Sequence, residues 1–264
     1  QLVTAPPRKG RDAATLAYLA AYTSEPETAL RVAQAATVAV IGLGGLGCEV
    51  IRHLAALGVR RLVCVDHDRV EASNLNRQFC YSPADLGRPK IDVIIEYLER
   101  HAPEVRVAGR QRFVTSEADL ADVLPTTDRN CDLVVCCADQ PIGRVELACL
   151  GAARASHAAF AFVAMHIGRG YWGLIVSDGA MRGAEDFFNS ACELDACADV
   201  GTVQGAASWE NSLLAAHLCD AIVRRLTNLP SRGFLNRMNS VEFSGPNSRV
   251  VVDFRRDLSA GARA

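Results

Sequence analysis

A glycine-rich turn near the start of the chain has residue types and spacing suited to holding a nucleotide. Gly42, Gly44 and Gly47 follow the pattern G-x-G-x-x-G, and the acidic residue Asp66 stands a short distance further on. Glycines let the backbone turn sharply and approach a ligand closely. A helix that begins at such a turn offers free N–H groups to phosphate, and an aspartate beyond the next strand can accept hydrogen bonds from ribose hydroxyls. We therefore predict a nucleotide site, with a tight turn that merely requires small residues as the alternative.

Two cationic side chains after this aspartate indicate which nucleotide is used. Arg77 and Lys90 both lie in the polar segment that follows Asp66. A dehydrogenase binds pyrophosphate mainly through the glycine turn and the helix dipole, and it needs no such cations. An enzyme that cleaves a triphosphate does need them, because negative charge moves onto the departing pyrophosphate. These residues favour ATP chemistry, although both could also be solvated surface charges.

Another acidic residue follows a later apolar run. Asp139 lies directly beyond residues 133–138, and a carboxylate at a strand end is well placed to bind Mg²⁺ through oxygen. We predict that Asp139 is this ligand, and it could also cap a helix that begins near Pro141. Asp68 has two interpretations, as a residue that shapes the loop or as a nucleotide ligand.

Short apolar runs alternate with segments of helical apolar spacing, and this alternation must position the residues above. The runs that we expect as strands are 37–41, 62–65, 105–113, 132–137, 160–165 and 171–176. The segments that we expect as helices are 48–57, 91–101, 116–124 and 141–155. Strands that are apolar throughout are typical of a parallel sheet covered on both faces. The fold class predicted is therefore α/β: a Rossmann-like, doubly wound, mostly parallel sheet with helices on both faces.

The two ends of the chain depart from this alternation. In chain order we expect an N-terminal extension (1–36) with a helix at 13–21, a main domain (37–264), a crossover loop (177–204), a long helix (206–226) and a C-terminal β-hairpin extension (234–243 with 249–254). Residues 178–200 in particular are polar, and we interpret them as irregular. The long helix carries apolar residues on more than one side, which predicts burial on several sides.

Composition excludes some classes of partner. The formal net charge is −2, which gives no indication of nucleic acid or of a membrane surface. No apolar run approaches the length of about 20 residues that a membrane helix needs, and the first residues lack the order of a signal peptide. We expect a cytoplasmic protein.

The ten cysteines are expected to be reduced and buried, because most lie in apolar runs. The sequence contains no C-x-x-C pair, and we therefore predict no structural zinc. Cys192 and Cys197 are the two cysteines of the polar segment at 178–200.

The combined motifs resemble those of the ThiF/MoeB/ubiquitin-activating (E1-like) adenylating family. The likeness covers roughly residues 37–177 and resumes over residues 201–226. It rests on the glycine turn 42–47, Asp66, the run Ser73-Asn74-Leu75-x-Arg77-Gln78, the run Gly87-x-Pro89-Lys90, and Ala138-Asp139. The resemblance implies ATP and Mg²⁺ as cofactors. It also implies that the C-terminal carboxylate of a small carrier protein or precursor peptide attacks the α-phosphate, giving an acyl-adenylate and pyrophosphate.

The resemblance also implies a role for particular residues. Nucleotide contacts are implied for Gly42, Gly44, Gly45, Gly47, Asp66, Asp68, Ser73, Asn74, Arg77, Gln78, Lys90, Asp139 and Gln140. Arg77, Lys90 and Asp139 would carry catalysis. His166 and Arg169 follow a strand near the place where the family binds the incoming carboxyl tail. Cys197 resembles a loop cysteine that takes part in sulfur transfer in some relatives, but its acidic neighbours should blunt its nucleophilicity.

Two departures from the family affect the interpretation. Many relatives carry two zinc-binding C-x-x-C pairs, and an N-terminal arginine that reaches the partner subunit's active site; the segment 13–21 contains no arginine. The absence of the zinc pairs favours a specialised biosynthetic enzyme. An NAD-dependent oxidoreductase and a non-catalytic partner subunit of an activating complex remain the alternatives. The family implies a homodimer. The apolar residues on several sides of the helix at 206–226 favour this helix as part of the interface, with coverage by the terminal hairpin as the alternative.

Overall fold

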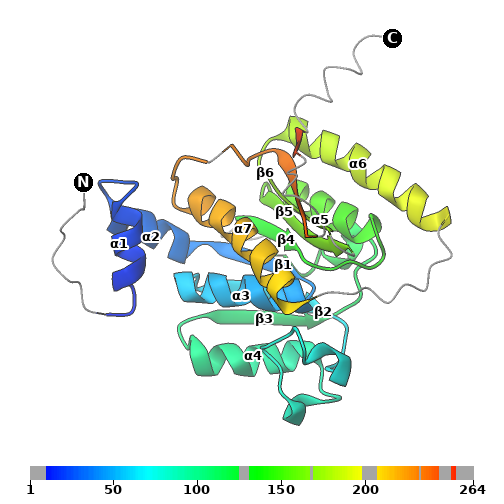
Figure 1. The fold of residues 1–264 in the computed structure, drawn as a ribbon, viewed down its shortest axis with the longest axis horizontal. Coiled ribbons are helices and arrows are strands. Elements are labelled where there is room, and N and C mark those ends of the chain that lie inside the picture. Colours follow the sequence, from blue (N-terminus) through cyan, green and yellow to red (C-terminus); the bar gives the residue numbers. More distant parts are fainter. Residues whose placement is uncertain are drawn as a thin grey trace, which may run out of the picture.

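A single eight-stranded sheet forms the centre of the computed structural model, drawn in Figure 1. The structure describes residues 10–124, 131–166, 169–197, 207–231, 233–243 and 251–253. The strands are β1 (Thr37–Ile41), β2 (Arg61–Asp66), β3 (Arg106–Gln111), β4 (Leu133–Cys136), β5 (Ala159–His166), β6 (Arg169–Ile175), β7 (Arg237–Glu242) and β8 (Val251–Asp253). Their order across the sheet is β3-β2-β1-β4-β5-β6-β7-β8. The first five strands are parallel to one another.

Helices connect and cover these strands. They are α1 (Ala13–Ala20), α2 (Pro26–Ala35), α3 (Gly45–Leu57), α4 (Lys90–His101), α5 (Arg144–Ala155), α6 (Asp178–Cys197) and α7 (Ser208–Leu226). Strand order reverses direction between β1 and β4, which is the arrangement of a doubly wound sheet. In such sheets ligands bind outside the carboxyl ends of the strands at this reversal. No described helix is long and apolar enough to span a membrane.

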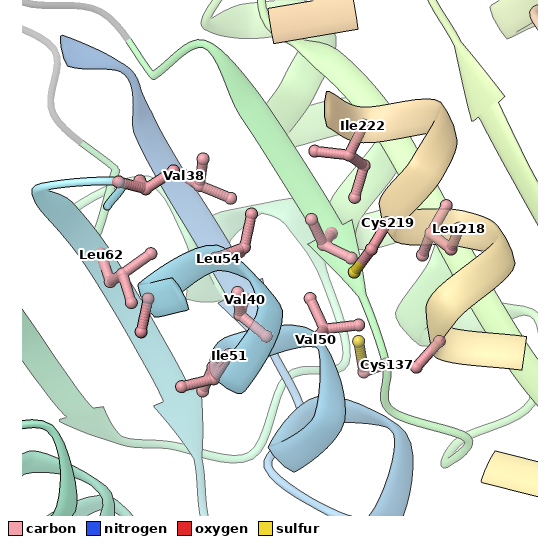
Figure 2. Close-up of a cluster of buried hydrophobic side chains, with 14 of the residues drawn as sticks. Val38, Val40, Val50, Ile51, Leu54, Leu62, Cys137, Leu218, Cys219 and Ile222 are labelled. Carbon is pink, nitrogen blue, oxygen red and sulfur yellow. The ribbon is translucent and has the colours of Figure 1, made fainter. Parts of the chain in front are cut away.

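Successive residues of the parallel strands pack on opposite faces. Val38 and Val40 of β1 belong to a cluster with α3, α4 and α7, whereas Ala39 and Ile41 belong to a cluster with α5 and α6. Figure 2 shows the first cluster, in which side chains of α3 and α7 meet over β1 and β2. The prediction of a buried, mostly parallel sheet with helices on both faces is thereby confirmed.

The direction of the sheet changes after β5. Strands β6, β7 and β8 are antiparallel to their neighbours. The predicted C-terminal hairpin is present as β7 paired with β8, and it continues the main sheet. Its predicted turn lies outside the described residues.

The interpretation of residues 178–200 as irregular was wrong for most of the segment, because Asp178–Cys197 form the helix α6. Ala180, Met181, Ala184 and Phe188 are buried against the α5 face of the sheet. This apolar stripe has helical spacing, but the many polar residues between its members hide it. The remainder of the predicted crossover loop, from 198 onward, lies almost entirely outside the described residues.

Smaller differences concern caps and cysteines. The helix predicted at 116–124 is a single 3₁₀ turn at Glu117–Asp119, with Ser116 at its N-cap. Eight of the nine described cysteines are buried and Cys192 is half-buried, which confirms the expectation of buried thiols for that part of the chain. Burial raises the pKa of the Cys64 thiol to about 12, so this thiol stays protonated and unreactive.

Candidate functional site

A pocket of about 380 Å³ lies beyond the carboxyl ends of the parallel strands. Most of the residues predicted for the nucleotide site line it: Gly42, Gly44, Gly45, Asp66, Asp68, Asn74, Arg77, Gln78, Lys90, Asp139 and Gln140. Gly47 and Ser73 are the two predicted nucleotide contacts that do not. The topology thus brings together residues from β1, β2, the loop after β2, α4 and the segment after β4.

The glycines of the turn are required for different reasons. Gly42 has φ +91°, and a Cβ there would lie 2.5 Å from the backbone nitrogen of Ala138. A Cβ on Gly47 would lie 1.9 Å from the carbonyl oxygen of Gly42, so Gly47 supports the turn from behind. At Gly45 the obstacle is a side chain, because a Cβ would come within 2.3 Å of the Asn211 Nδ2. The tight-turn interpretation therefore holds for Gly42 and Gly47, while their contact with a nucleotide stays a prediction.

Helix α3 begins inside the pocket. Its N-cap is Gly44, and no side chain caps this end. The first-turn N–H groups and the positive end of the helix dipole are therefore directed at the pocket, which suits a phosphate group.

Asp66 connects the glycine turn to the loop after β2. One carboxylate oxygen accepts a hydrogen bond of 2.6 Å from the Leu43 N–H, and the other accepts one of 2.7 Å from the Asp68 N–H. Asp66 is buried. Each carboxylate oxygen can accept more than one hydrogen bond, so the residue can hold the turn and still accept ribose hydroxyls.

The buried Lys90 forms an ion pair with the more exposed Asp68 at the pocket wall. The Lys90 Nζ lies 2.8 Å from Asp68 Oδ2, and only 4 % of Lys90 is exposed. The Lys90 N–H also donates to the Asp68 carbonyl at 2.9 Å. His67 Nε2 lies 3.1 Å from the other Asp68 oxygen. Asp68 thus orients the lysine that the sequence predicted as a phosphate ligand, in addition to shaping the loop.

The loop that follows β2 carries the next predicted residues. Asn74 Oδ1 accepts a hydrogen bond of 3.0 Å from the Glu71 N–H. Arg77 is held against its own loop, because its Nη1 donates to the Ser73 carbonyl at 2.7 Å and to Asn76 Oδ1 at 3.0 Å. The Ser73 hydroxyl is exposed and directed at Glu71. Arg77 therefore lines the pocket while its guanidinium is held by hydrogen bonds to its own loop.

Asp139 stands at the mouth of the pocket, beyond β4. Removal of its carboxyl from water raises the pKa of Asp139, and the nearby positive charges of Lys90 and Arg77 act in the opposite direction. Asp68 raises the same pKa further by like-charge repulsion. The charge of Asp139 thus interacts with the charges of Lys90 and Arg77, the other two residues predicted to carry catalysis.

The donor set at this pocket fits a hard divalent cation, since its acids offer oxygen ligands. Among the described residues, the acidic and imidazole groups close enough to share one ion are Asp66, His67 and Asp68, whose ligand atoms lie within 4.8 Å of one another. Asp139 is not part of that group. An Mg²⁺ ion held by Asp139 would complete its shell with phosphate oxygens and water, as Mg²⁺ commonly does.

Several residues that line the pocket were not predicted as site residues, among them His67, Arg112, Phe113, Met165 and Asn211. Arg112 and Phe113 follow β3, so the carboxyl-end rule for parallel strands could have indicated them. The Phe113 ring lies edge-on to His67, with centroids 4.5 Å apart. Asn211 could have been noticed as a polar residue on the apolar stripe of α7.

The residues predicted for the carboxylate substrate lie elsewhere or outside the description. Arg169 opens β6 opposite Glu242 and does not line the pocket. His166 ends β5 and Cys197 ends α6, and the side chains of both lie outside the described part of the structure.

Residues 19–252 match the ThiF family, and the chain therefore belongs to it. It is 37% identical to the adenylyltransferase and sulfurtransferase uba4 of Aspergillus niger over 111 residues. These residues cover 42% of this chain and 22% of that protein. It is 43% identical to the sulfur carrier protein adenylyltransferase of Thermus thermophilus over 104 residues. These residues cover 39% of this chain and 36% of that protein. The chain spans well under two thirds of the length of both relatives.

The fold is also shared with solved structures. E. coli MccB, crystallised with AMPCPP and MccA, superposes with a TM-score of 0.78 over 94% of this chain and 72% of that chain, at 21% identity. PaaA superposes with a TM-score of 0.73 over 95% of this chain and 76% of that chain, at 18% identity.

Proposed function

We propose that this protein adenylates a C-terminal carboxylate at the expense of ATP. The observation that carries the proposal is the convergence of the glycine turn, Asp66, Arg77, Lys90 and Asp139 on one pocket. Asp66 can accept hydrogen bonds from a ribose, and the N-terminus of α3 can bind a phosphate. The two cations, Arg77 and Lys90, can stabilise the departing pyrophosphate. An enzyme that only transfers hydride has no use for this cation pair.

The reaction requires positioning more than proton transfer. A carboxylate is already ionised at neutral pH, so one of its oxygens can attack the α-phosphorus without a general base. The bond from that phosphorus to the oxygen bridging the β-phosphate breaks, and pyrophosphate leaves with the electron pair. Lys90 and Arg77 stabilise the charge on the leaving group, while the turn and α3 hold the α-phosphate in place.

A divalent cation would supply further charge neutralisation for the triphosphate. Asp139 is the residue proposed to hold it. Asp68 is less available for that role, because one of its oxygens contacts Lys90 at 2.8 Å and the other lies 3.1 Å from His67.

The substrate class follows from the relatives. The Thermus thermophilus relative is named for a sulfur carrier protein, and MccB was crystallised with MccA. We propose a small carrier protein or a precursor peptide as the donor of the carboxylate, in a biosynthetic pathway.

We also propose that the protein is a homodimer. Helix α7 is mostly covered within the chain, since Leu214, Leu218 and Ile222 are buried against α3 and the sheet. Trp209 and Leu213 lie one turn apart on its exposed side, with 73% and 43% of their surfaces in solvent. These two side chains are the proposed contact. Light scattering at micromolar concentration should give twice the mass of 28.3 kDa, whereas a monomer mass unchanged by ATP would refute the dimer.

An exchange assay tests the proposed activity. The protein is incubated with ATP, Mg²⁺, labelled pyrophosphate and a panel of peptides with free C-termini. Label should enter ATP only with an acceptable peptide, and amidation of its C-terminus should abolish the exchange. Reduction of NAD or binding of NADH in calorimetry, without exchange, would favour the oxidoreductase alternative.

A further inference from the structure

Asn211 occupies a position where the fold otherwise places apolar side chains. On α7 the residues three to four apart, Leu214, Leu218 and Ile222, are all buried, and Asn211 extends this stripe at the first turn of the helix. Only 2% of Asn211 is exposed, and it lines the nucleotide pocket. A buried amide without a hydrogen-bond partner costs free energy, so its presence at this position requires a reason.

The glycine turn makes room for this amide. A Cβ on Gly45 would lie 2.3 Å from the Asn211 Nδ2 and 3.2 Å from its Cγ, so the observed position of the Asn211 amide depends on the glycine at position 45. Gln78 approaches the same turn, with its Nε2 3.8 Å from where a Cβ on Gly44 would lie. Gln78 Oε1 is buried without a hydrogen-bond partner among the described residues, and Gln78 and Asn211 both line the pocket. Two amide side chains therefore border the start of α3.

We propose that the Asn211 amide binds the α-phosphate of the bound nucleotide. The proposal rests on the proposed function. Asp66 fixes the ribose beside Leu43, whose N–H it accepts, so the first phosphate beyond the ribose lies along the next residues of the turn, Gly44 and Gly45. A phosphoryl oxygen is a charged acceptor, and an N–H donor desolvated beside it forms a strong hydrogen bond. Asn211 would thus hold the phosphorus atom that the carboxylate attacks.

Calorimetry with three ligands and the variant Asn211→Leu tests this role. Adenosine lacks phosphate, AMP carries only the α-phosphate, and ATP carries all three. The variant should bind AMP and ATP about tenfold more weakly or worse, as expected for loss of a hydrogen bond to a charged group, and should bind adenosine as the wild type does. A loss confined to ATP, or equal losses for all three ligands, would overturn the assignment.

Thermal unfolding separates binding from structure. Because Asn211→Leu replaces a buried amide by an apolar side chain of similar size on an apolar stripe of α7, the free variant should unfold at the wild-type temperature or above it. The matched control is Asn236→Leu, since Asn236 is buried but accepts hydrogen bonds from the N–H groups of Val176 at 2.8 Å and Ser177 at 3.3 Å. That control should lower the unfolding temperature and leave AMP affinity unchanged. Asn211→Leu behaving like the control would refute the proposal, whereas wild-type protein without nucleotide binding or exchange would refute the proposed function.

Discussion

The segment from β1 to α4 and the segment after β5 contribute to the molecule in different ways. In the first, the functional side chains are fixed by short-range contacts: Asp66 accepts backbone N–H groups of the turn and the loop, and Lys90 pairs with Asp68. In the second, Arg169 lies outside the pocket on an antiparallel strand. The proposed nucleotide site is therefore a locally encoded, preorganised set of groups, whereas the residues predicted for the carboxylate partner belong to the part of the fold that departs from the parallel pattern.

The same division explains what the sequence could predict. Strands β1, β2 and β4 are buried along almost their whole length, so their apolar runs were readable without neighbours, whereas every residue of β3 is exposed or half-buried. The turn residues act near one another in sequence. Asn211 is different, because its meaning depends on Gly45, which is remote in sequence and meets it only through the packing of α7 on α3. Helix α6 was missed because its buried stripe is narrow and its other positions are polar. The antiparallel direction of β6 was not predicted, because an apolar run does not reveal the direction in which a strand pairs with its neighbour.

The largest expected effect lies at Asp139. Replacement by alanine should lower ATP–pyrophosphate exchange by about 100-fold or more, because the metal and the charge that it balances act on the transition state. The fold should be retained, since Asp139 stands at the mouth of the pocket. Asp92→Ala, which removes an exposed acid of α4, serves as control and should keep full exchange. Unchanged exchange with normal Mg²⁺ dependence in Asp139→Ala would contradict the assignment.

The next effect concerns Lys90, which is one of only two lysines in the chain, the other being Lys9. An ATP derivative with an acyl-phosphate group at its terminal phosphate should acylate Lys90, and excess ATP should suppress the reaction. Lys9 provides an internal reference for labelling that does not depend on the site. Mass spectrometry of the digested protein gives both yields, and preferential labelling of Lys9 would place the triphosphate elsewhere.

Arg169 tests the other side of the comparison with a smaller effect. Because it does not line the nucleotide pocket, Arg169→Ala should leave the Kd for ATP unchanged. If it pairs with the incoming carboxylate, the KM for the peptide should rise about tenfold, as for loss of one charge-assisted contact. Equal weakening of ATP and peptide would indicate that the two segments are not separable.

The smallest effect lies at the rim, where Asp119 closes the 3₁₀ turn next to Arg112. Hydrogen bonds from Thr115 and Ser116 lower the pKa of the Asp119 carboxyl to about 2. A lowered pKa means that this stabilisation is present above the ordinary value of about 4 and is lost as pH falls toward 2. NMR titration of Asp119 should therefore give a midpoint well below that of an exposed aspartate. A midpoint near 4 would show that the turn is open in solution.

The double use of Asp66 has a practical consequence for anyone who needs an inactive form of this protein. Its two oxygens accept hydrogen bonds from the Leu43 and Asp68 N–H groups, so substitution there removes the proposed ribose contact and loosens the turn and the loop together. Loss of function in such a variant, in a pull-down or a complementation experiment, would not separate binding from structure. Asp139, at the solvent-facing mouth, is the position where the proposed function predicts that substitution gives an inactive but folded protein.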